Sequence, residues 1–365
     1  MKNLNYILKT NGDLSEVTIT GVKEGVKTVT IPDTIKGVPV VHLGVACFKH
    51  SALEKVTFKT KHLKTIGYEC FENSQIKTIE LPEGVEEIDT SAFNKCKNLT
   101  RIKFPISLIH AEWGIIQNCP NLQKIEMDEK EPTISYISVE NNCLISTTHS
   151  VVTYKEVIAG CNKSVIPEGT TLIRMNAFRG SGIKSVTFPI DVKEIKQYAF
   201  ADCTDLQKVK FAINSNLKKI DCAGFMNTAI SQIILPQNIE EINSSAFRDC
   251  KNLTHVYTNK KDLLDPYSSW ENKSYDKTMD SNAFASCSNL EYVEIPLGIK
   301  NIWGNTFSDC SNLRTLSIQR KLYVFDVKNA GKGNRKLKTL ITPGEEIKFT
   351  SPKKLWDEMK RKVKV

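Results

Sequence analysis

Hydrophobic residues recur along this chain in a unit of 22 to 25 residues, interrupted by two longer steps of 37 and 62 residues. In Val192–Phe211, Phe200 is followed by Cys203, Leu206 and Val209, and these offsets return through most of the sequence. Self-similarity at such a period is typical of stacked repeats, so the pattern predicts a solenoid with one coil per copy. The copies align on Phe48, Phe71, Phe93, Ile116 (a weak copy), Phe178, Phe200, Phe225, Phe247, Phe284 and Phe307.

Each coil is predicted to hold a short strand after its phenylalanine. In Leu206–Phe211, the period of two turns Leu206, Val209 and Phe211 inward and Lys208 and Lys210 outward. Proline often follows this strand and ends it, because proline cannot donate to a sheet. A second inward aliphatic pair precedes the next phenylalanine. The expected fold class is therefore a β-rich repeat solenoid with short turns or helical segments between the strands.

Cysteine follows the same period. Six of the 11 cysteines lie three residues after the repeat phenylalanine or Ile116, and the other four coils carry Ser or Thr there. Free cysteine is among the most buried residue types, and its exchange with small hydroxyl residues indicates packing or capping in preference to disulfides. Cys143 and Cys161 lie outside the repeats and could pair. The residues of this slot are Cys96, Cys119, Cys203, Cys250, Cys287 and Cys310, with Ser51, Ser74, Ser181 and Thr228.

Two caps and two interruptions complete the expected organisation. Short strands at Glu16–Thr20 and Lys27–Ile31 belong to the N-terminal cap. The C-terminal cap is expected to contain a strand pair within 322–327 and 337–343, then a helix that starts at Ser351-Pro352. The apolar stripe of that helix is Leu355, Trp356, Met359 and Val363. The predicted segments are 1–47 (N-terminal cap and opening coil), 48–127 (repeats), 128–170 (a hairpin-like interruption), 171–318 (repeats with a loop insertion at 259–280) and 319–365 (C-terminal cap and basic tail).

These motifs carry a family resemblance. AFxxCxxL followed by VxFP and VxxI resembles the BspA-type leucine-rich repeat of bacterial surface proteins and some parasitic protists, over roughly residues 27–318. The opening TVTIPDTIKGVPVVHLG is similar to the usual first coil of that family. The resemblance implies a right-handed leucine-rich-repeat solenoid with one parallel β-sheet face. It also implies a role as an adhesin or a protein-binding scaffold.

The charge of the chain lies at one end. Residues 319–365 hold 14 Lys or Arg and 5 Asp or Glu, which equals the whole net charge of +9 and leaves the preceding residues neutral overall. Such a tail could attract nucleic acid or an anionic membrane surface, and its binding would then depend steeply on salt. A solvated, Lys-rich cap is the commoner structure, and we do not expect nucleic acid as a partner.

The sequence predicts no enzyme. It contains no HExxH, GxSxG, Walker A or CxxC motif, and its six histidines lack metal-ligand spacing. A nucleophile should interrupt a repeat, whereas the cysteines and carboxylates here follow it. We therefore expect no catalytic residue, no cofactor and no metal.

The outward positions of the predicted sheet offer a better candidate site. Most are polar, but an apolar and aromatic group falls on three consecutive coils beside the 259–280 insertion, which is itself aromatic. Exposed aromatics beside a loop are the usual chemistry of a protein-binding hot spot. The insertion could equally fold back and bury them. The candidate partner-binding residues are Ile234, His255, Tyr257, Tyr292, Tyr267, Trp270 and Tyr275.

We therefore predict a monomeric, non-enzymatic scaffold that binds a protein or a glycoconjugate, as an adhesin of the cell surface. The alternative is an intracellular scaffold whose basic tail binds an acidic partner. The N-terminus MKNLNYILKTNGDL has no apolar region long enough for a signal peptide, and no run of about 20 apolar residues could span a membrane. The expected location is the cell surface or the medium if a signal peptide precedes this chain in the cell, and otherwise the cytoplasm.

Overall fold

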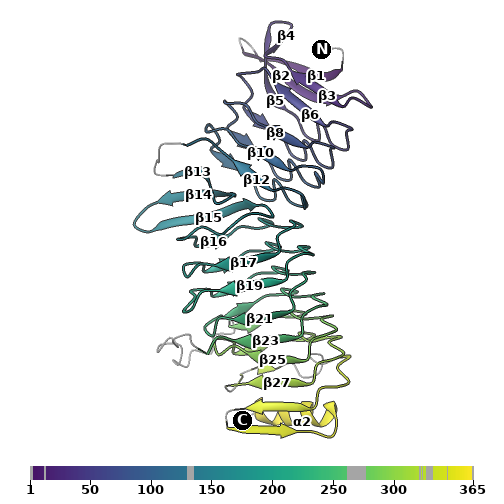
Figure 1. Cartoon of the computed structure of the whole chain (residues 1–365), viewed down its shortest axis with the longest axis vertical. Helices are drawn as coiled ribbons and strands as arrows, with labels where there is room; N and C mark the ends of the chain where they lie inside the picture. Colours follow the sequence, from purple (N-terminus) through teal and green to yellow (C-terminus); the bar gives the residue numbers. More distant parts are fainter. Residues whose placement is uncertain are drawn as a thin grey trace. The chain divides into compact units, whose positions relative to one another are not determined.

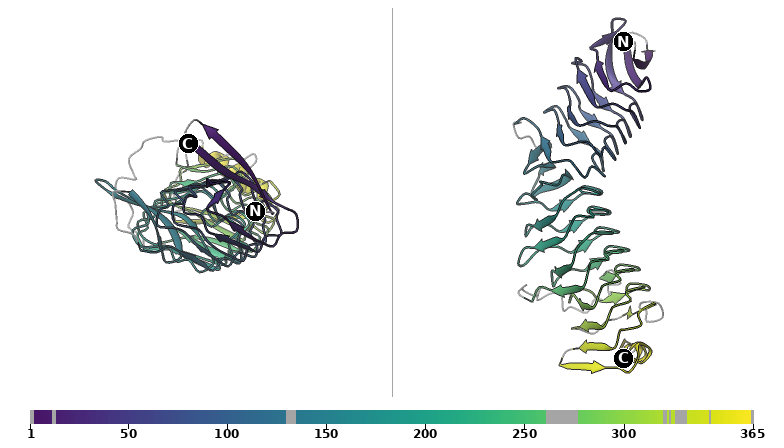
Figure 2. Two further views of the ribbon diagram at one scale, coloured as in Figure 1. Left: turned by 90° about the horizontal axis from the view of Figure 1, so that it is seen from above. Right: turned by 45° about the vertical axis from the view of Figure 1, so that its right-hand side comes forward.

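Stacked coils make up two units of the chain, which are described here one at a time (Figure 1). A computed structural model describes residues 3–11, 14–129, 135–260, 277–319, 322, 324–325, 332–342 and 344–363. Unit 1 comprises Met1–Pro167 and Arg174–Ile183, and unit 2 comprises Glu168–Ile173 and Lys184–Val365. In both, the coils lie one above another as a leucine-rich-repeat solenoid should, and Figure 2 shows this stacking within each unit.

Unit 1 begins with a long antiparallel pair, β1 (Leu4–Asn11) and β2 (Leu14–Val22). Two kinds of parallel strand follow in each coil, a strand of three or four residues on what we call the sheet face and a mostly two-residue strand on what we call the narrow ladder. The sheet face consists of β3 (Thr28–Ile31), β6 (Lys55–Phe58), β8 (Thr78–Glu80), β10 (Arg101–Lys103) and β12 (Lys124–Glu126). The narrow ladder consists of β5 (Val38–Leu43, with β4, Thr34–Ile35, against it), β7 (Thr65–Ile66), β9 (Glu87–Ile88) and β11 (His110–Ala111).

The predicted interruption of the array is a three-stranded antiparallel meander in unit 1. It consists of β13 (Ser135–Glu140), β14 (Cys143–His149) and β15 (Thr153–Gly160). Gly160 lies against the repeat phenylalanine of the next coil, since a Cβ there would stand 2.0 Å from Cε1 of Phe178. The absence of a side chain at Gly160 therefore lets the meander cover that ring.

Unit 2 repeats the same two-strand coil. Its sheet face consists of β17 (Ser185–Phe188), β19 (Lys208–Phe211), β21 (Gln232–Leu235), β23 (His255–Thr258), β25 (Tyr292–Ile295), β27 (Thr315–Ile318) and β29 (Thr339–Thr342), with β30 (Glu345–Lys348) antiparallel to β29. Its narrow ladder consists of β16 (Leu172–Ile173), β18 (Glu194–Ile195), β20 (Lys219–Ile220), β22 (Glu241–Ile242), β24 (Thr278–Met279), β26 (Asn301–Ile302) and β28 (Val324–Phe325). The family resemblance implies one parallel sheet, and the structure adds this second, narrow one.

The repeat phenylalanines form the centre of both units. The rings of Phe71 and Phe93 stack at a centroid distance of 5.0 Å in unit 1, and those of Phe225 and Phe247 stack at 5.3 Å in unit 2. All nine repeat phenylalanines are buried, and so is Ile116 at the equivalent position of the weak copy. The repeat alignment is therefore confirmed, and aromatic stacking runs from coil to coil along the core.

Left-handed backbone brackets every one of these rings. The residues two before and two after each repeat position all have φ between 52° and 67°. Left-handed φ costs an ordinary residue roughly 1–2 kcal/mol, so neighbouring coils must hold these turns in place. They do so by hydrogen bonds between coils, such as Ala46 N–H to Tyr68 O (2.8 Å) and His50 N–H to Glu72 O (2.8 Å). Between the strands, where the sequence allowed either turns or helical segments, the structure has these turns. In the described part of the chain, α2 (Pro352–Val363) is the one helix.

The cysteine slot is a ladder of buried hydrogen-bond donors. Five of its thiols donate to the carbonyl oxygen of the repeat phenylalanine one coil earlier, whereas the Ser51 and Thr228 hydroxyls donate to the phenylalanine of their own coil. All 11 cysteines are free thiols, Cys143 and Cys161 included, as the packing interpretation requires. The thiol contacts are Cys96 to Phe71 (3.0 Å), Cys119 to Phe93 (3.1 Å), Cys250 to Phe225 (3.1 Å), Cys287 to Phe247 (3.1 Å) and Cys310 to Phe284 (3.0 Å).

The two ends of the chain depart from the sequence prediction. β1 was not predicted, and the expected strand pair within 322–327 and 337–343 is wrong, because β28 continues the narrow ladder while β29 pairs with β27 and β30. The helix is confirmed, since the Ser351 hydroxyl accepts from Lys354 N–H at 3.4 Å. Leu355 and Met359 are buried, and the side chains of Trp356 and Val363 lie outside the described residues.

Candidate functional site

Ion pairs cover the outward side of the unit 1 sheet face. Glu126 lies between two cations, Arg101 and Lys124, and hydrogen bonds from Lys124 and then Arg101 hold the pKa of its carboxyl below the usual range. Lys103 reaches Asp128 at 2.9 Å and Glu80 at 3.3 Å, and these carboxylates raise the pKa of its ammonium. Of the cations on this sheet face, Lys55 alone has no carboxylate partner among the described residues. Ion pairs therefore neutralise most, but not all, of the cations on this surface.

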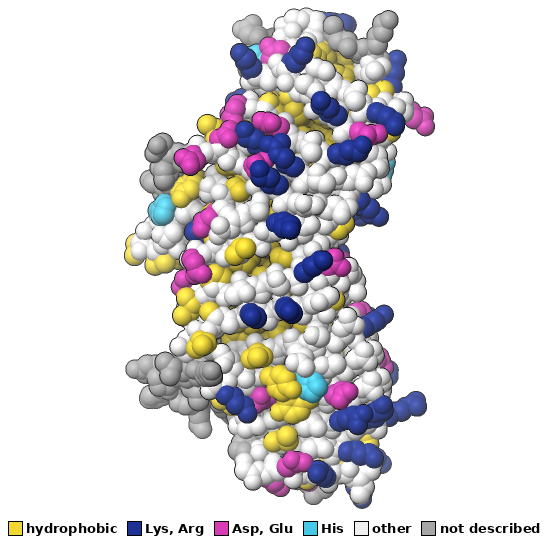
Figure 3. All heavy atoms as spheres, in the orientation of Figure 1, with side chains coloured by type: hydrophobic (Ala, Val, Ile, Leu, Met, Phe, Trp, Pro, Cys, Tyr) yellow, Lys and Arg dark blue, Asp and Glu magenta, His cyan; other side chains and the backbone are white. Residues whose placement is uncertain are grey.

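The outward side of the unit 2 sheet face has a different character. His255 and Tyr257 alternate along β23, and Tyr292 occupies the next strand. The ring centroids are 5.4 Å apart for His255 and Tyr257, 5.5 Å for Tyr257 and Tyr292, and 6.2 Å for His255 and Tyr292. We call these three residues the aromatic cluster. Figure 3 shows hydrophobic side chains gathered beside a histidine at this part of unit 2.

The members of the aromatic cluster are half-buried, and Ile234 beside them is 54% exposed. Burial raises the pKa of the Tyr292 hydroxyl, so this side chain stays neutral at physiological pH. The buried Nδ1 atom of His255 has no hydrogen-bond partner within the described ranges. The sequence thus placed four candidate residues on one surface. The other three, Tyr267, Trp270 and Tyr275, lie outside the described residues.

One outward position next to the cluster is buried, although its place in the repeat predicts that it is exposed. The side chain of Glu294 on β25 is 4% exposed. Its Oε2 accepts a hydrogen bond from Thr258 N–H at 3.2 Å, and its Oε1 lies 3.9 Å from Lys260 Nζ. This carboxylate therefore links β25 to the end of β23, the strand that carries His255 and Tyr257.

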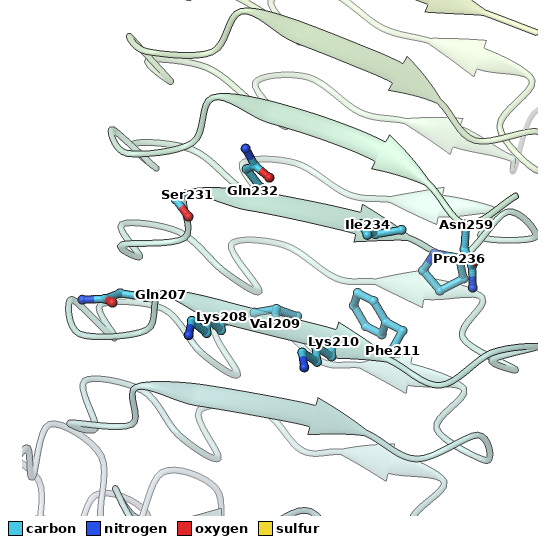
Figure 4. Close-up of a pocket in the computed structure, with 10 residues that line it drawn as sticks. All are labelled: Gln207, Lys208, Val209, Lys210, Phe211, Ser231, Gln232, Ile234, Pro236 and Asn259. Atoms are coloured by element: carbon cyan, nitrogen blue, oxygen red, sulfur yellow. The ribbon is translucent and has the colours of Figure 1, made fainter.

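A groove opens on the same face between β19 and β21. Adjacent sheet-face strands are paired from β17 to β19 and from β21 onward, yet within the described residues no strand pairing joins β19 to β21. The hollow at this break has a volume of about 470 Å³. It is lined by Gln207, Lys208, Val209, Lys210, Phe211, Ser231, Gln232, Ile234, Pro236 and Asn259, which Figure 4 displays.

The break coincides with a short coil of the repeat. Coils with Ser or Thr in the cysteine slot are one residue shorter between the slot and the next inward aliphatic, and β21 follows such a slot at Thr228. In unit 1 the pairing also fails before a short coil, between β6 and β8, where the slot holds Ser74. A short coil therefore accompanies both breaks, although β21 and β23, which also differ in coil length, stay paired.

The groove is amphipathic along its length. Figure 4 shows the polar Gln207, Ser231 and Gln232 at one end and Phe211, Ile234 and Pro236 at the other. Phe211 was expected to point inward, but it is half-buried and lines the groove while its ring stacks on Phe188 at 5.1 Å. The sequence analysis gave the lysines of β19 no role. The short coil at Thr228 and the 25-residue step before Phe225 are the signals that could have located this groove.

The described residues contain no group of three or more His, Cys, Asp or Glu side chains that could hold a metal ion. In the same portion of the chain, no helix has the length and apolar character needed to cross a bilayer. The chemistry available on the sheet face of unit 2 is that of contact: stacked rings, an exposed aliphatic side chain, two lysines and amide groups.

Coils of this length with paired parallel strands define a leucine-rich-repeat solenoid. The profile of the BspA type leucine rich repeat region matches residues 23–150, 171–269 and 267–350, in 6 copies. The chain belongs to the BspA-type leucine-rich-repeat family. A comparison with curated protein sequences found no match.

Solved structures share this fold at low sequence identity. A leucine-rich repeat protein from Bacteroides ovatus is similar with a TM-score of 0.53 and 19% identity, over 93% of each chain. The pneumococcal vaccine antigen PcpA has a TM-score of 0.57 and 16% identity, over 94% of this chain and 97% of its own. A leucine-rich repeat protein from Eubacterium ventriosum has a TM-score of 0.53 and 17% identity, over 93% and 91%. At these identities the likeness concerns the fold.

Proposed function

We propose that this protein is a non-enzymatic binding scaffold whose partner, a protein or a glycoprotein, docks on the sheet face of unit 2. The observation that carries the proposal is the aromatic cluster of His255, Tyr257 and Tyr292 beside the exposed Ile234. Tyrosine is enriched in interface hot spots because a large, stiff ring contributes contact area while its hydroxyl stays hydrated. No such cluster occurs among the described residues of the largely ion-paired sheet face of unit 1, and this favours unit 2 as the docking surface.

We further propose that the chain acts at the cell surface, in adhesion to a host or neighbouring cell. Family membership supports this role, and one solved relative of the same fold is a pneumococcal vaccine antigen. Protease shaving of intact source cells, followed by detection with an antibody to the repeats, tests the location. Loss of the protein by shaving is the expected result. Protection inside the cell would favour the alternative, an intracellular scaffold that uses its basic tail.

Binding itself is tested by the double variant Tyr257→Ala/Tyr292→Ala. The fluorescently labelled chain is applied to candidate host and neighbouring cells, and cell-bound fluorescence is measured. A hot-spot pair should lower the affinity at least tenfold, because each hot-spot truncation costs roughly 2 kcal/mol. The matched control is Tyr68→Ala, which removes an exposed tyrosine of unit 1 that lies off the sheet face. Equal binding by the double variant and the wild type would overturn the proposal.

A further inference from the structure

The two lysines of β19 have no ion-pair partner among the described residues. Lys208 and Lys210 are both exposed and both line the groove, one residue apart on the same side of the strand. Within the described ranges, neither ammonium lies in ion-pair distance of a carboxylate. Of the cations at equivalent positions of unit 1, Arg101 and Lys103 are both paired with carboxylates, whereas Lys55 has no such partner within the described ranges. Two neighbouring like charges without a counter-charge repel each other, and an anionic occupant would relieve that repulsion.

The groove offers more than charge. Beyond Lys210 its lining becomes apolar, with Phe211, Ile234 and Pro236 at that end. Amide and hydroxyl groups of Gln207, Ser231 and Gln232 at the opposite end can bond to peptide groups of a ligand. A volume of about 470 Å³ is that of a pocket for a few residues of peptide or a small molecule.

The spacing of the two lysines along β19 matches the spacing of alternate side chains in an extended peptide. Alternate residues of a strand lie on one side and are separated by roughly 6.6 Å, at 3.3 Å per residue. An extended peptide that runs along β19 presents its own alternate side chains at this same interval. Acidic side chains at two positions one residue apart would therefore meet Lys208 and Lys210 together, and an apolar side chain farther along would reach Ile234 and Pro236.

We propose that the groove between β19 and β21 binds an extended acidic peptide segment of a protein partner, with the pattern acid–any–acid followed by an apolar residue. The lysines hold the two carboxylates, and the apolar end of the groove holds the hydrophobic side chain. This inference rests on the proposed function, which it deepens by giving the chemistry of the segment bound next to the aromatic cluster.

The test uses the whole chain and capped, fluorescein-labelled decapeptides. One set carries Glu-x-Glu with an apolar residue two positions away on either side, and comparison sets carry Glu-Glu, Glu-x-x-Glu or Gln-x-Gln. Anisotropy titrations at low and at physiological salt should give the tightest binding for Glu-x-Glu, weakened by salt. Equal affinity for all spacings, or for the Gln peptides, would overturn the proposal.

Two double variants that remove the same charge test whether the peptide binds in the groove. Lys208→Gln/Lys210→Gln should weaken the Glu-x-Glu peptide on the order of tenfold, which corresponds to two exposed charge contacts of about 0.7 kcal/mol each. Arg101→Gln/Lys103→Gln removes the same charge from the corresponding positions of unit 1 and should leave the affinity unchanged. Lys208→Glu/Lys210→Glu should instead select Lys-x-Lys peptides. Equal loss in both Gln variants would indicate a non-specific charge effect and would contradict the groove.

Acidic glycans are tested separately, because they could also bind the two lysines. If oligomers of a uronic acid bind through Lys208 and Lys210 while the peptides do not, the peptide proposal is overturned. The cell-binding assay separates this inference from the proposed function. Retention of cell binding by Lys208→Gln/Lys210→Gln, together with its loss in Tyr257→Ala/Tyr292→Ala, would refute the acidic segment and leave the docking surface in place.

Discussion

The two units share one interior and differ on their sheet faces. Both have stacked phenylalanines, a ladder of buried thiols and left-handed turns on either side of each ring. On the outside, unit 1 pairs its sheet-face cations other than Lys55 with carboxylates, whereas unit 2 presents an aromatic cluster, an exposed Ile234 and two lysines without an ion-pair partner among the described residues. Repetition thus accounts for stability and leaves the outward positions free to vary, so function is to be sought where the outward pattern changes.

The largest expected effect tests the shared interior. Phe200 is fully buried, and its ring stacks on Phe225 at 5.2 Å. Phe200→Ala should lower the free energy of unfolding by about 3–5 kcal/mol, because it leaves a cavity between two coils. Phe71→Ala in unit 1 should cost a similar amount, as measured by chemical denaturation. A cost below about 1 kcal/mol at either site would mean that the two interiors are not equivalent.

The second prediction concerns the thiol ladder. Burial raises the pKa of the Cys250 thiol to about 11 from its ordinary value of 9.0. A raised thiol pKa stabilises the fold fully below pH 9, and this contribution is lost as the pH rises toward 11, because the unfolded thiol ionises first. The stability difference between the wild type and Cys250→Ala should therefore shift against the wild type by on the order of 2 kcal/mol between pH 8 and pH 10.5. Urea unfolding at the two pH values in the presence of a reductant measures it, and a constant difference would contradict buried, ionisation-resistant packing.

The interior could be predicted from the sequence because every coil repeats the same pattern of buried residues. Phe, Cys and the inward aliphatics keep fixed offsets, so even the weak copy at Ile116 could be placed. The left-handed turns could have been predicted only in part. Asn, Asp or Gly, which tolerate positive φ, hold many of these positions, whereas Ala46, Glu69 and Tyr198 have no such preference. Hydrogen bonds between coils impose that conformation, and they exist only once the coils stack.

The ends and the groove escaped prediction for a related reason. β28 and β29 follow each other in sequence, but each extends a different ladder, and this assignment depends on the coil beneath. The groove lies where strand pairing between two neighbouring coils is interrupted, and a single repeat does not contain that relation. The aromatic cluster was found because its side chains break the polar pattern of the outward positions at His255, Tyr257 and Tyr292.

A smaller effect should distinguish the two sheet faces. Glu126→Gln removes the carboxylate shared by Arg101 and Lys124, and should cost about 0.5–1 kcal/mol because the pairs are partly exposed. Because the pKa of Glu126 is lowered, this contribution is complete above the ordinary glutamate pKa of 4.5 and is lost as the pH falls through the lowered pKa. Thermal unfolding of both forms at pH 7 and at pH 3 should thus show a difference at the first pH only. The same difference at pH 3 would indicate a packing effect in place of an ionic one.

The smallest expected effect is the most informative about unit 2. Lys208→Gln/Lys210→Gln removes two exposed charges that have no ion-pair partner among the described residues, so the free energy of unfolding should change by less than about 0.5 kcal/mol. Relief of the repulsion between the two ammonium groups could even raise it slightly, most visibly at low salt. Chemical denaturation beside Glu126→Gln gives the comparison directly. A loss above about 1 kcal/mol would make the lysines structural. The contrast between a sheet face whose cations are mostly paired and one whose two lysines are available to a ligand would then no longer hold.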